Sequence, residues 1–301
     1  MIRLFGSAAP APRDSAQDRT LAAFLRGASI EVMPRTAEKV ADFSAILPKG
    51  TRVYIAHIDG TPIEDMVATA ARLRREGMEP MPHFPARSIP DRQTLGGWIA
   101  RYQGEADVRQ GLILAGGIPE ASGDYETSMQ LLESGAFDGF ERLHVAGHPE
   151  GNRDIDPDGS AKNVSDALAW KQKFSERTDA KMALATQFCF EAEPVIEWAE
   201  AIRAAGIDLP VHIGVAGPTK LQTLIKFAIA CGVGPSLRVL QKRAMDVTKL
   251  LVPHEPDEFL VTLARHKAAN PDFPIEAVHL FPLGGIKTSA DWLDAHRKDE
   301  E

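Results

Sequence analysis

The sequence predicts an α/β fold, a single parallel (β/α)8 barrel of the TIM-barrel type. Short apolar runs alternate with amphipathic segments eight times along the 301 residues. No Gly-x-Gly-x-x-Gly motif opens a helix after a strand, as a doubly wound dinucleotide-binding sheet would require, and Gly116-Gly117 alone is too short to count as one. The regular spacing continues without a break in composition, which favours one barrel over two domains.

Each predicted strand is a short apolar run, suited to burial in a parallel sheet, and is bounded by glycine, proline or polar residues. The predicted strands are 28–33, 52–57, 79–84, 110–115, 140–146, 182–186, 210–215 and 275–281. The predicted helices are 17–27, 36–48, 62–77, 91–102, 126–134, 160–177, 191–205, 220–231, 236–251, 257–269 and 288–296.

Two of these helices, 236–251 and 257–269, are additional to the barrel repeat and precede its last strand. The segment 1–16 is rich in alanine, proline and serine, which predicts a flexible N-terminal arm. The sequence therefore predicts an arm followed by one barrel catalytic domain, 17–301.

The composition indicates a globular protein, with 44% hydrophobic and 25% charged residues. A net charge of -8 argues against nucleic acid or an anionic membrane as a partner. No apolar stretch is long enough to span a bilayer, and Cys189 and Cys231 form no Cys-x-x-Cys pair. We therefore expect a cytoplasmic protein, and the sequence leaves open whether it forms a homo-oligomer.

Two polar residues stand out at predicted strand ends, where barrel enzymes place their functional groups. Glu31 lies in the apolar run 29–33, where desolvation is expected to raise its pKa and suit it to general acid catalysis. The alternative is a Glu31 that pairs with a barrel lysine or arginine for stability. Gln187 follows the strand 182–186, and its amide can both donate to and accept from a flat heterocycle. The alternative is that Gln187 only caps the strand.

Histidines also gather at the predicted strand ends: His57, His83, His144 and His148. A metal site is not predicted, because there is no His-Glu-x-x-His motif and no acidic or cysteine ligand at a fixed offset. Neutral histidines that bond a ligand or a loop carbonyl are the favoured interpretation. The small residues of 214–220 would allow an anion to approach a helix start, although an ordinary βα turn explains that loop better.

Several of these segments together resemble the methylenetetrahydrofolate reductase family. The strongest are Ile30–Arg35 and Ala185–Glu191, and the resemblance extends from about Ala28 to Leu283. Shorter supporting segments lie at the other strand ends: 82–84, 146–150, 213–215 and 279–281. The family is a (β/α)8 barrel that binds FAD and interconverts 5,10-methylene- and 5-methyltetrahydrofolate, usually with NAD(P)H as reductant.

The resemblance implies a role for each matching residue. Glu31 would be the catalytic acid that protonates a folate nitrogen to open the imidazolidine ring. The folate-binding set would be Gln187, Phe188 and Leu221. The flavin-binding set would be His57, His83, Ala115, Gly116, Gly117, His148, Asp166 and Lys173.

The sequence departs from the family mainly at the flavin and nicotinamide ends, which indicates an atypical branch. Ala115-Gly116-Gly117 stands where the family has Arg-Gly-Asp, and Ala169 and Gln172 replace an asparagine and an arginine. Leu221 takes the place of an aromatic residue that stacks on folate or nicotinamide.

Three functions are therefore open. The first is an FAD-dependent oxidoreductase acting on a CH–NH group of tetrahydrofolate in one-carbon metabolism, with NAD(P)H as a candidate reductant. The second is a flavin-free tetrahydrofolate-binding barrel that passes a methyl group to a partner, such as a corrinoid protein. The third is a non-enzymatic folate-binding subunit of a redox protein.

Overall fold

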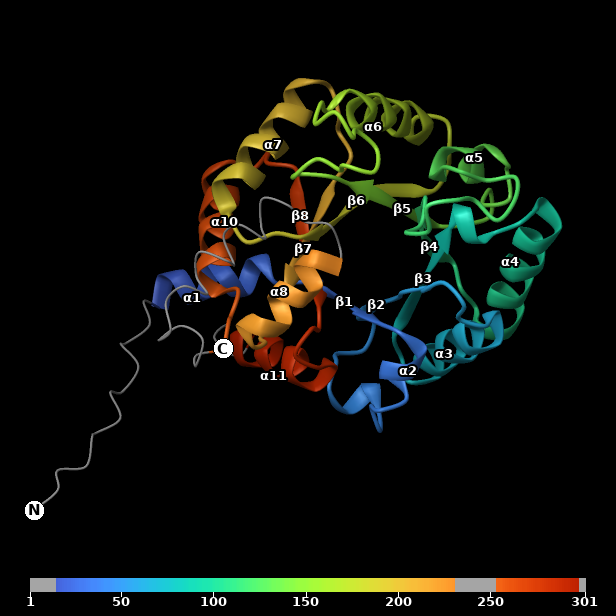
Figure 1. Ribbon diagram of the computed structural model, residues 1–301. Coiled ribbons are helices and arrows are strands. Elements are labelled where there is room, and N and C mark those ends of the chain that lie inside the picture. Colours follow the sequence, from blue (N-terminus) through green and yellow to red (C-terminus); the bar gives the residue numbers. More distant parts are fainter. Residues whose placement is uncertain (1–14, 231–252, 298–301) are drawn as a thin grey trace, which may run out of the picture.

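A computed structural model describes residues 15–230 and 253–297 and confirms the (β/α)8 barrel (Figure 1). All strands are parallel, each pairs with the next in sequence, and β8 closes the ring on β1. The strands are β1 (Ser29–Val32), β2 (Arg52–Ile55), β3 (Glu79–Pro85), β4 (Gln110–Leu114), β5 (Arg142–Gly147), β6 (Lys181–Phe188), β7 (Val211–Ala216) and β8 (Ile275–Phe281).

Helices surround the ring of strands (Figure 1). They are α1 (Ser15–Phe24), α2 (Pro34–Ala37), α3 (Ile63–Arg75), α4 (Arg92–Ala106), α5 (Ser128–Glu133), α6 (Lys162–Ser175), α7 (Ala192–Ala204), α8 (Leu221–Ala230), α10 (Asp257–Ala269) and α11 (Ile286–Arg297). The extra helix predicted at 257–269 is confirmed as α10. The helix predicted at 236–251 and most of the predicted arm lie outside the described residues. No helix in the described part of the chain is long and apolar enough to cross a membrane.

The helix predicted at 36–48 is wrong, because α2 stops after one turn and only a short 3-10 helix follows. Side chains of α3 and its end satisfy the backbone of this segment instead. The Arg72 guanidinium donates to the carbonyl of Ala37 at 3.0 Å, and the Glu76 carboxylate accepts from the Phe43 N–H at 2.7 Å. These tertiary hydrogen bonds replace the ones that a longer helix would have made internally.

The main apolar core lies between the strands and the surrounding helices. The barrel interior is separate and of mixed character. It holds a small apolar cluster formed by Tyr54, Met81, Leu112 and Ala185. It also holds buried polar side chains from β1, β5, β7 and β8: Ser29, His144, His212 and His279. Branched apolar residues dominate most barrel interiors, so this polar filling calls for a reason beyond stability.

Helix α8 lies over the carboxyl ends of β6, β7 and β8 (Figure 1). Its residues Leu221 and Leu224 pack on Phe188, Phe190 and Ala216, which follow or end those strands. The helix therefore covers one side of the barrel mouth with an apolar surface.

Strand β6 carries one extra residue between Ala185 and Phe188 relative to β7. The bulge brings its backbone against Gly214, where an added Cβ would lie 2.4 Å from the carbonyl oxygen of Thr186. The Thr186 hydroxyl completes the junction by accepting from the Gly214 N–H at 2.8 Å. The bulge thus requires a glycine in the neighbouring strand.

Two glycine-to-alanine substitutions should change stability in opposite directions. Gly214→Ala forces the new methyl group into the β6 backbone and should lower the free energy of unfolding by about 1–3 kcal/mol. Gly97→Ala lies in α4 with open space around the added Cβ, and should raise it by about 0.5–1 kcal/mol. Urea unfolding of both variants checks this pair. An unchanged Gly214→Ala protein would contradict the close approach of the two strands.

Candidate functional site

Glu31 is the centre of the candidate site. It lies near the carboxyl end of β1, and its side chain is 20% exposed. Its carboxylate oxygen Oε2 lies 3.3 Å from Nε2 of His83 on β3 and 3.7 Å from Nε2 of His279 on β8. No arginine or lysine pairs with Glu31 in the described part of the chain, so the stabilising pair considered as an alternative is not seen there. The carboxylate faces two imidazoles at the barrel mouth.

The expected rise in the pKa of Glu31 is wrong. Burial alone would raise it, but hydrogen bonding and charge interactions with His279 and His83 together outweigh burial and lower the pKa to about 2. Burial is also the main reason that the pKa of His279 falls below its usual value. At neutral pH the site therefore holds an ionised carboxylate beside a neutral His279.

A second layer of polar side chains lies behind Glu31. His279 Nδ1 is 2.9 Å from the Ser29 hydroxyl, and the Tyr54 hydroxyl is 2.5 Å from His144 Nδ1. The ring of His144 packs against the ring of His212, with centroids 4.5 Å apart. The sequence analysis named His144 among the strand-end histidines, but it did not place Ser29, Tyr54, His212 and His279 in the site. Because strand side chains alternate, Ser29 must share the inward face with Glu31, and that signal could have identified it.

Gln187 lies at the exposed end of β6. Its side-chain amide has no hydrogen-bond partner in the part of the chain that the structure describes. The strand end is instead held by Thr186, whose hydroxyl donates to the Gln187 carbonyl at 2.8 Å. The donor and acceptor groups of the Gln187 amide are thus both available at the barrel mouth, and they are not needed to cap the strand.

The other predicted folate residues are buried. Phe188 and Leu221 belong to the apolar cluster beneath α8, where Phe188 makes edge contacts with the rings of Phe190 and Phe281. Phe281 is half-buried at the end of β8, and its ring lies 4.8 Å from that of His279. Phe281 therefore places an aromatic edge beside the Glu31 centre, a position that the sequence analysis did not assign to the site.

The predicted flavin residues near β2, β3 and β4 lie at the strand ends. His57 Nε2 is 3.0 Å from the Thr61 carbonyl, and its ring packs on Trp98 of α4. Gly116 adopts a φ of 98°, and an added Cβ would lie 3.1 Å from Pro85. Gly117 has open space around the position of a side chain. The backbone of this turn is therefore bare at the mouth and carries no carboxylate.

The predicted flavin residues on α6 face away from the barrel. Asp166 and Lys173 are exposed, and Asp166 pairs with Lys162 at 2.6 Å. The buried lysine of this helix is Lys171, whose ammonium donates to the Ala146 carbonyl of β5 at 2.8 Å. The sequence analysis did not identify which of the three lysines of α6 is buried, because this depends on which face of the helix packs on the strands.

Burial lowers the pKa of Lys171 to about 8. Beside it, burial and then the charge of Lys171 lower the pKa of His148 to about 4, so His148 is neutral at neutral pH. The end of β5 therefore places a desolvated cation and a neutral imidazole next to each other. Such a pair suits an anionic or hydrogen-bond-accepting group of a ligand.

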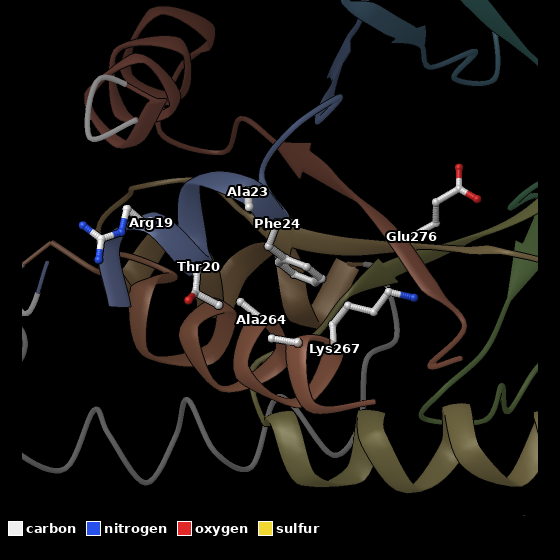
Figure 2. Close-up of a pocket in the computed structure, with 8 residues that line it drawn as sticks. Arg19, Thr20, Ala23, Phe24, Ala264, Lys267 and Glu276 are labelled. Atoms are coloured by element: carbon white, nitrogen blue, oxygen red, sulfur yellow. The ribbon is translucent and has the colours of Figure 1, made fainter. Parts of the chain in front are cut away.

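A groove of about 600 Å³ lies elsewhere, between α1 and α10 (Figure 2). Arg19 and Phe24 of α1 face Ala264 and Lys267 of α10 there, with Glu276 near the start of β8. It therefore lies toward the amino end of β8, opposite the end that carries His279. The Lys267 ammonium is already used by the carbonyls of Pro271 and Phe273. We therefore do not assign the candidate site to this groove.

The fold and the site define a (β/α)8-barrel protein with a carboxylate–imidazole centre at the carboxyl ends of its strands. No family model matches the sequence. The fold is similar to that of an uncharacterised protein from Clostridium thermocellum that binds two copies of 5-methyl-5,6,7,8-tetrahydrofolic acid. The TM-score is 0.58 at 10% sequence identity, and the match covers 94% of this chain and 98% of that one. At this identity the likeness concerns the fold.

Lys171 should make stability depend on alkaline pH. Its folded pKa of about 8 lies below the ordinary value of 10.5, so the unfolded chain binds more protons between these values and stability rises with pH. This contribution is on the order of 3 kcal/mol in total. Lys171→Met should remove the rise, whereas Lys173→Met, at an exposed lysine of the same helix, should keep it. Urea unfolding from pH 7 to 10.5 tests this, and equal slopes in both variants would contradict it.

Proposed function

We propose that this protein is an enzyme of one-carbon metabolism that binds a tetrahydrofolate derivative at its barrel mouth. The proposed reaction interconverts 5,10-methylene- and 5-methyltetrahydrofolate. The observation that carries the proposal is the Glu31 carboxylate, held at the mouth beside His83 and His279. The likeness of the whole fold to a barrel that binds 5-methyltetrahydrofolic acid supports the choice of ligand.

The reaction needs a group that exchanges a proton with a folate nitrogen. Opening the five-membered ring of the methylene form requires a proton on that nitrogen, and closing it releases the proton. Glu31 is ionised in the free protein, so it is ready to accept the proton when the ring closes. The same carboxyl group, once protonated, returns the proton in the opposite direction, as general acid–base catalysis requires.

The surroundings of Glu31 suit a flat, polar heterocycle. Gln187 offers an amide donor and acceptor that have no partner among the described residues, and they match the mixed edge of a pterin. Phe281 offers an aromatic edge next to His279, and α8 covers the β6–β8 side with apolar residues. Together these groups would orient the heterocycle with its reacting nitrogen toward Glu31.

FAD is the proposed hydride carrier, with NAD(P)H as the candidate reductant. His83 and the turn 115–117 lie at the barrel mouth, but Asp166 and Lys173 lie on the exposed face of α6. Asp166 is already paired with Lys162, and Gly117 offers no side chain at the mouth, so the set does not fit an extended dinucleotide. We therefore derive no step through the flavin.

That poor fit favours a second candidate function. A flavin-free barrel could hold 5-methyltetrahydrofolate in the same way and pass its methyl group to a partner protein. Glu31, once it has taken up a proton, would then pass it to the folate nitrogen as the methyl group leaves. The folate-binding residues serve both functions, and only the electron carrier separates them.

Titration with FAD distinguishes the two functions. If the protein is a flavoprotein, added FAD should bind with a changed visible spectrum, and 5-methyltetrahydrofolate should bleach the bound flavin. Methyl transfer to a cobalamin acceptor without flavin would support the second function instead. If 5-methyltetrahydrofolate does not bind at all, both functions are excluded.

Glu31→Gln should preserve the fold and folate binding but lower turnover by roughly 10²–10⁴-fold, because an amide cannot exchange the proton. The matched control is Glu276→Gln, an exposed glutamate near the opposite end of the barrel, which should keep wild-type turnover. Steady-state kinetics and calorimetric folate titration measure the two effects. Turnover of Glu31→Gln near that of the wild type would remove Glu31 from the mechanism.

Gln187→Ala should weaken folate binding by about 1–3 kcal/mol, because a ligand donor or acceptor loses its partner. Its thermal stability should stay close to that of the wild type, since the amide makes no bond in the described structure. Gln93→Ala, at an exposed position of α4, serves as the control for a general loss of binding. Equal folate affinities in the two variants would show that Gln187 does not read the ligand.

A further inference from the structure

The two oxygens of the Glu31 carboxylate have different surroundings. Nε2 of His83 lies 3.3 Å and Nε2 of His279 lies 3.7 Å from the same oxygen, Oε2. No hydrogen bond to the other oxygen, Oε1, is formed within the described residues, and 20% of the side chain is exposed. Glu31 therefore offers an oxygen that a ligand at the barrel mouth can reach.

Three titratable side chains from neighbouring strands face Glu31: Tyr54 of β2, His83 of β3 and His279 of β8. Burial raises the pKa of Tyr54 and is the main reason that the pKa of His279 is lowered, so both are neutral at neutral pH. His83 is the remaining neighbour that a proton can occupy beside the carboxylate. A ligand that reaches Glu31 therefore meets an ionised carboxylate, which accepts hydrogen bonds and donates none.

The proposed ligand brings a second acceptor to this contact. The nitrogen of 5-methyltetrahydrofolate that carries the methyl group is a tertiary amine, with a lone pair and no hydrogen. Two groups that only accept cannot form a hydrogen bond unless a proton lies between them, and leaving both unpaired at the contact is unfavourable. The contact between this nitrogen and Glu31 therefore requires one additional proton.

We propose that the site takes up this proton from water when 5-methyltetrahydrofolate binds, and holds the ligand as a nitrogen cation with Glu31 as its counter-ion. The inference rests on the proposed function, which directs the reacting nitrogen toward Glu31. One N–H bond forms on the ligand, the solvent supplies the proton, and no bond of the ligand breaks. The carboxylate and the nitrogen together change from a net negative charge to neutral.

The surroundings of Glu31 favour the nitrogen over the carboxylate as the place of the proton. Protonation of Glu31 would weaken its interactions with both imidazoles, which lower its pKa to about 2 against the effect of burial. The nitrogen is a weak base in water because it is attached to the pterin ring, so the free ligand is unprotonated at neutral pH. A carboxylate next to it favours its charged form.

The protonated nitrogen bears differently on the two candidate functions. When the methyl group passes to a nucleophilic acceptor, the N–C bond breaks and its electron pair stays on nitrogen. A nitrogen that is already protonated then leaves as a neutral amine and needs no further proton. Oxidation of the methyl group instead requires the lone pair, so the proton must first leave the nitrogen, and Glu31 lies beside it to accept.

Calorimetric titration with 5-methyltetrahydrofolate in two buffers of different ionisation enthalpy measures the protons taken up per ligand bound. Between pH 6 and 7.5 we expect an uptake of about one proton and a Kd that rises about tenfold per pH unit. This range lies above the pKa of about 4 of His148 and below the pKa of about 8 of Lys171, the titratable pair at the end of β5. The ¹³C signal of a labelled methyl group should match that of the free ligand in acid.

Two variants identify where the proton lies. In Glu31→Gln the amide can donate to the nitrogen directly, so the ligand should bind without proton uptake and its Kd should not change with pH. His83→Gln removes the other position for the proton and should keep an uptake of about one. The matched control, Glu276→Gln near the opposite end of the barrel, should also behave like the wild type.

Tetrahydrofolate is the control ligand, because its secondary amine already has a hydrogen to donate to Glu31 and should cause much less proton uptake. Binding of 5-methyltetrahydrofolate by the wild type without proton uptake overturns the inference and leaves the proposed function standing. Uptake that persists in Glu31→Gln, disappears in His83→Gln, or is equal for the two ligands overturns it as well. Failure of the folded wild type to bind 5-methyltetrahydrofolate excludes the proposed function itself.

Discussion

The contact between the Glu31 carboxylate and the imidazoles of His83 and His279 sets the character of the barrel interior. A carboxylate at a barrel mouth must be stabilised if it is to stay ionised, and imidazole N–H groups can stabilise it. His279 is itself held from behind, because its Nδ1 lies 2.9 Å from the Ser29 hydroxyl. The polar side chains of the interior thus begin with the support of one charged group at its mouth.

This polar interior is tolerated because stability comes from elsewhere. The main apolar core lies in the layer between strands and helices, where residues such as Ile30, Val53 and Leu73 are fully buried. Burial in that layer supplies the hydrophobic free energy of the fold. The strands thus present two faces with different tasks. The outward face holds the protein together, and the inward face is free to arrange acid–base groups.

The folate and flavin hypotheses differ in how their residues lie. Glu31 and Gln187 come from strands β1 and β6, on different sides of the barrel, yet both lie near the carboxyl ends of their strands. Two of the residues assigned to flavin binding, Asp166 and Lys173, lie on the solvent face of a helix. A ligand that contacts only the strand ends can be bound by the residues that lie there, whereas an extended cofactor also needs partners on α6. The positions of these residues therefore support the proposed folate site more directly than a flavin site.

The sequence alone determined the fold class and the identity of Glu31 as a candidate, because apolar periodicity and strand ends are local properties. It failed where distant residues decide: Arg72 and Glu76 replace a predicted helix, and the helix phase of α6 buries Lys171. It also assigned Glu31 a raised pKa, since desolvation can be inferred from apolar neighbours. The two imidazoles that lower this pKa come from β3 and β8. Only closure of the barrel brings them within reach, because parallel strands far apart in sequence converge at one end.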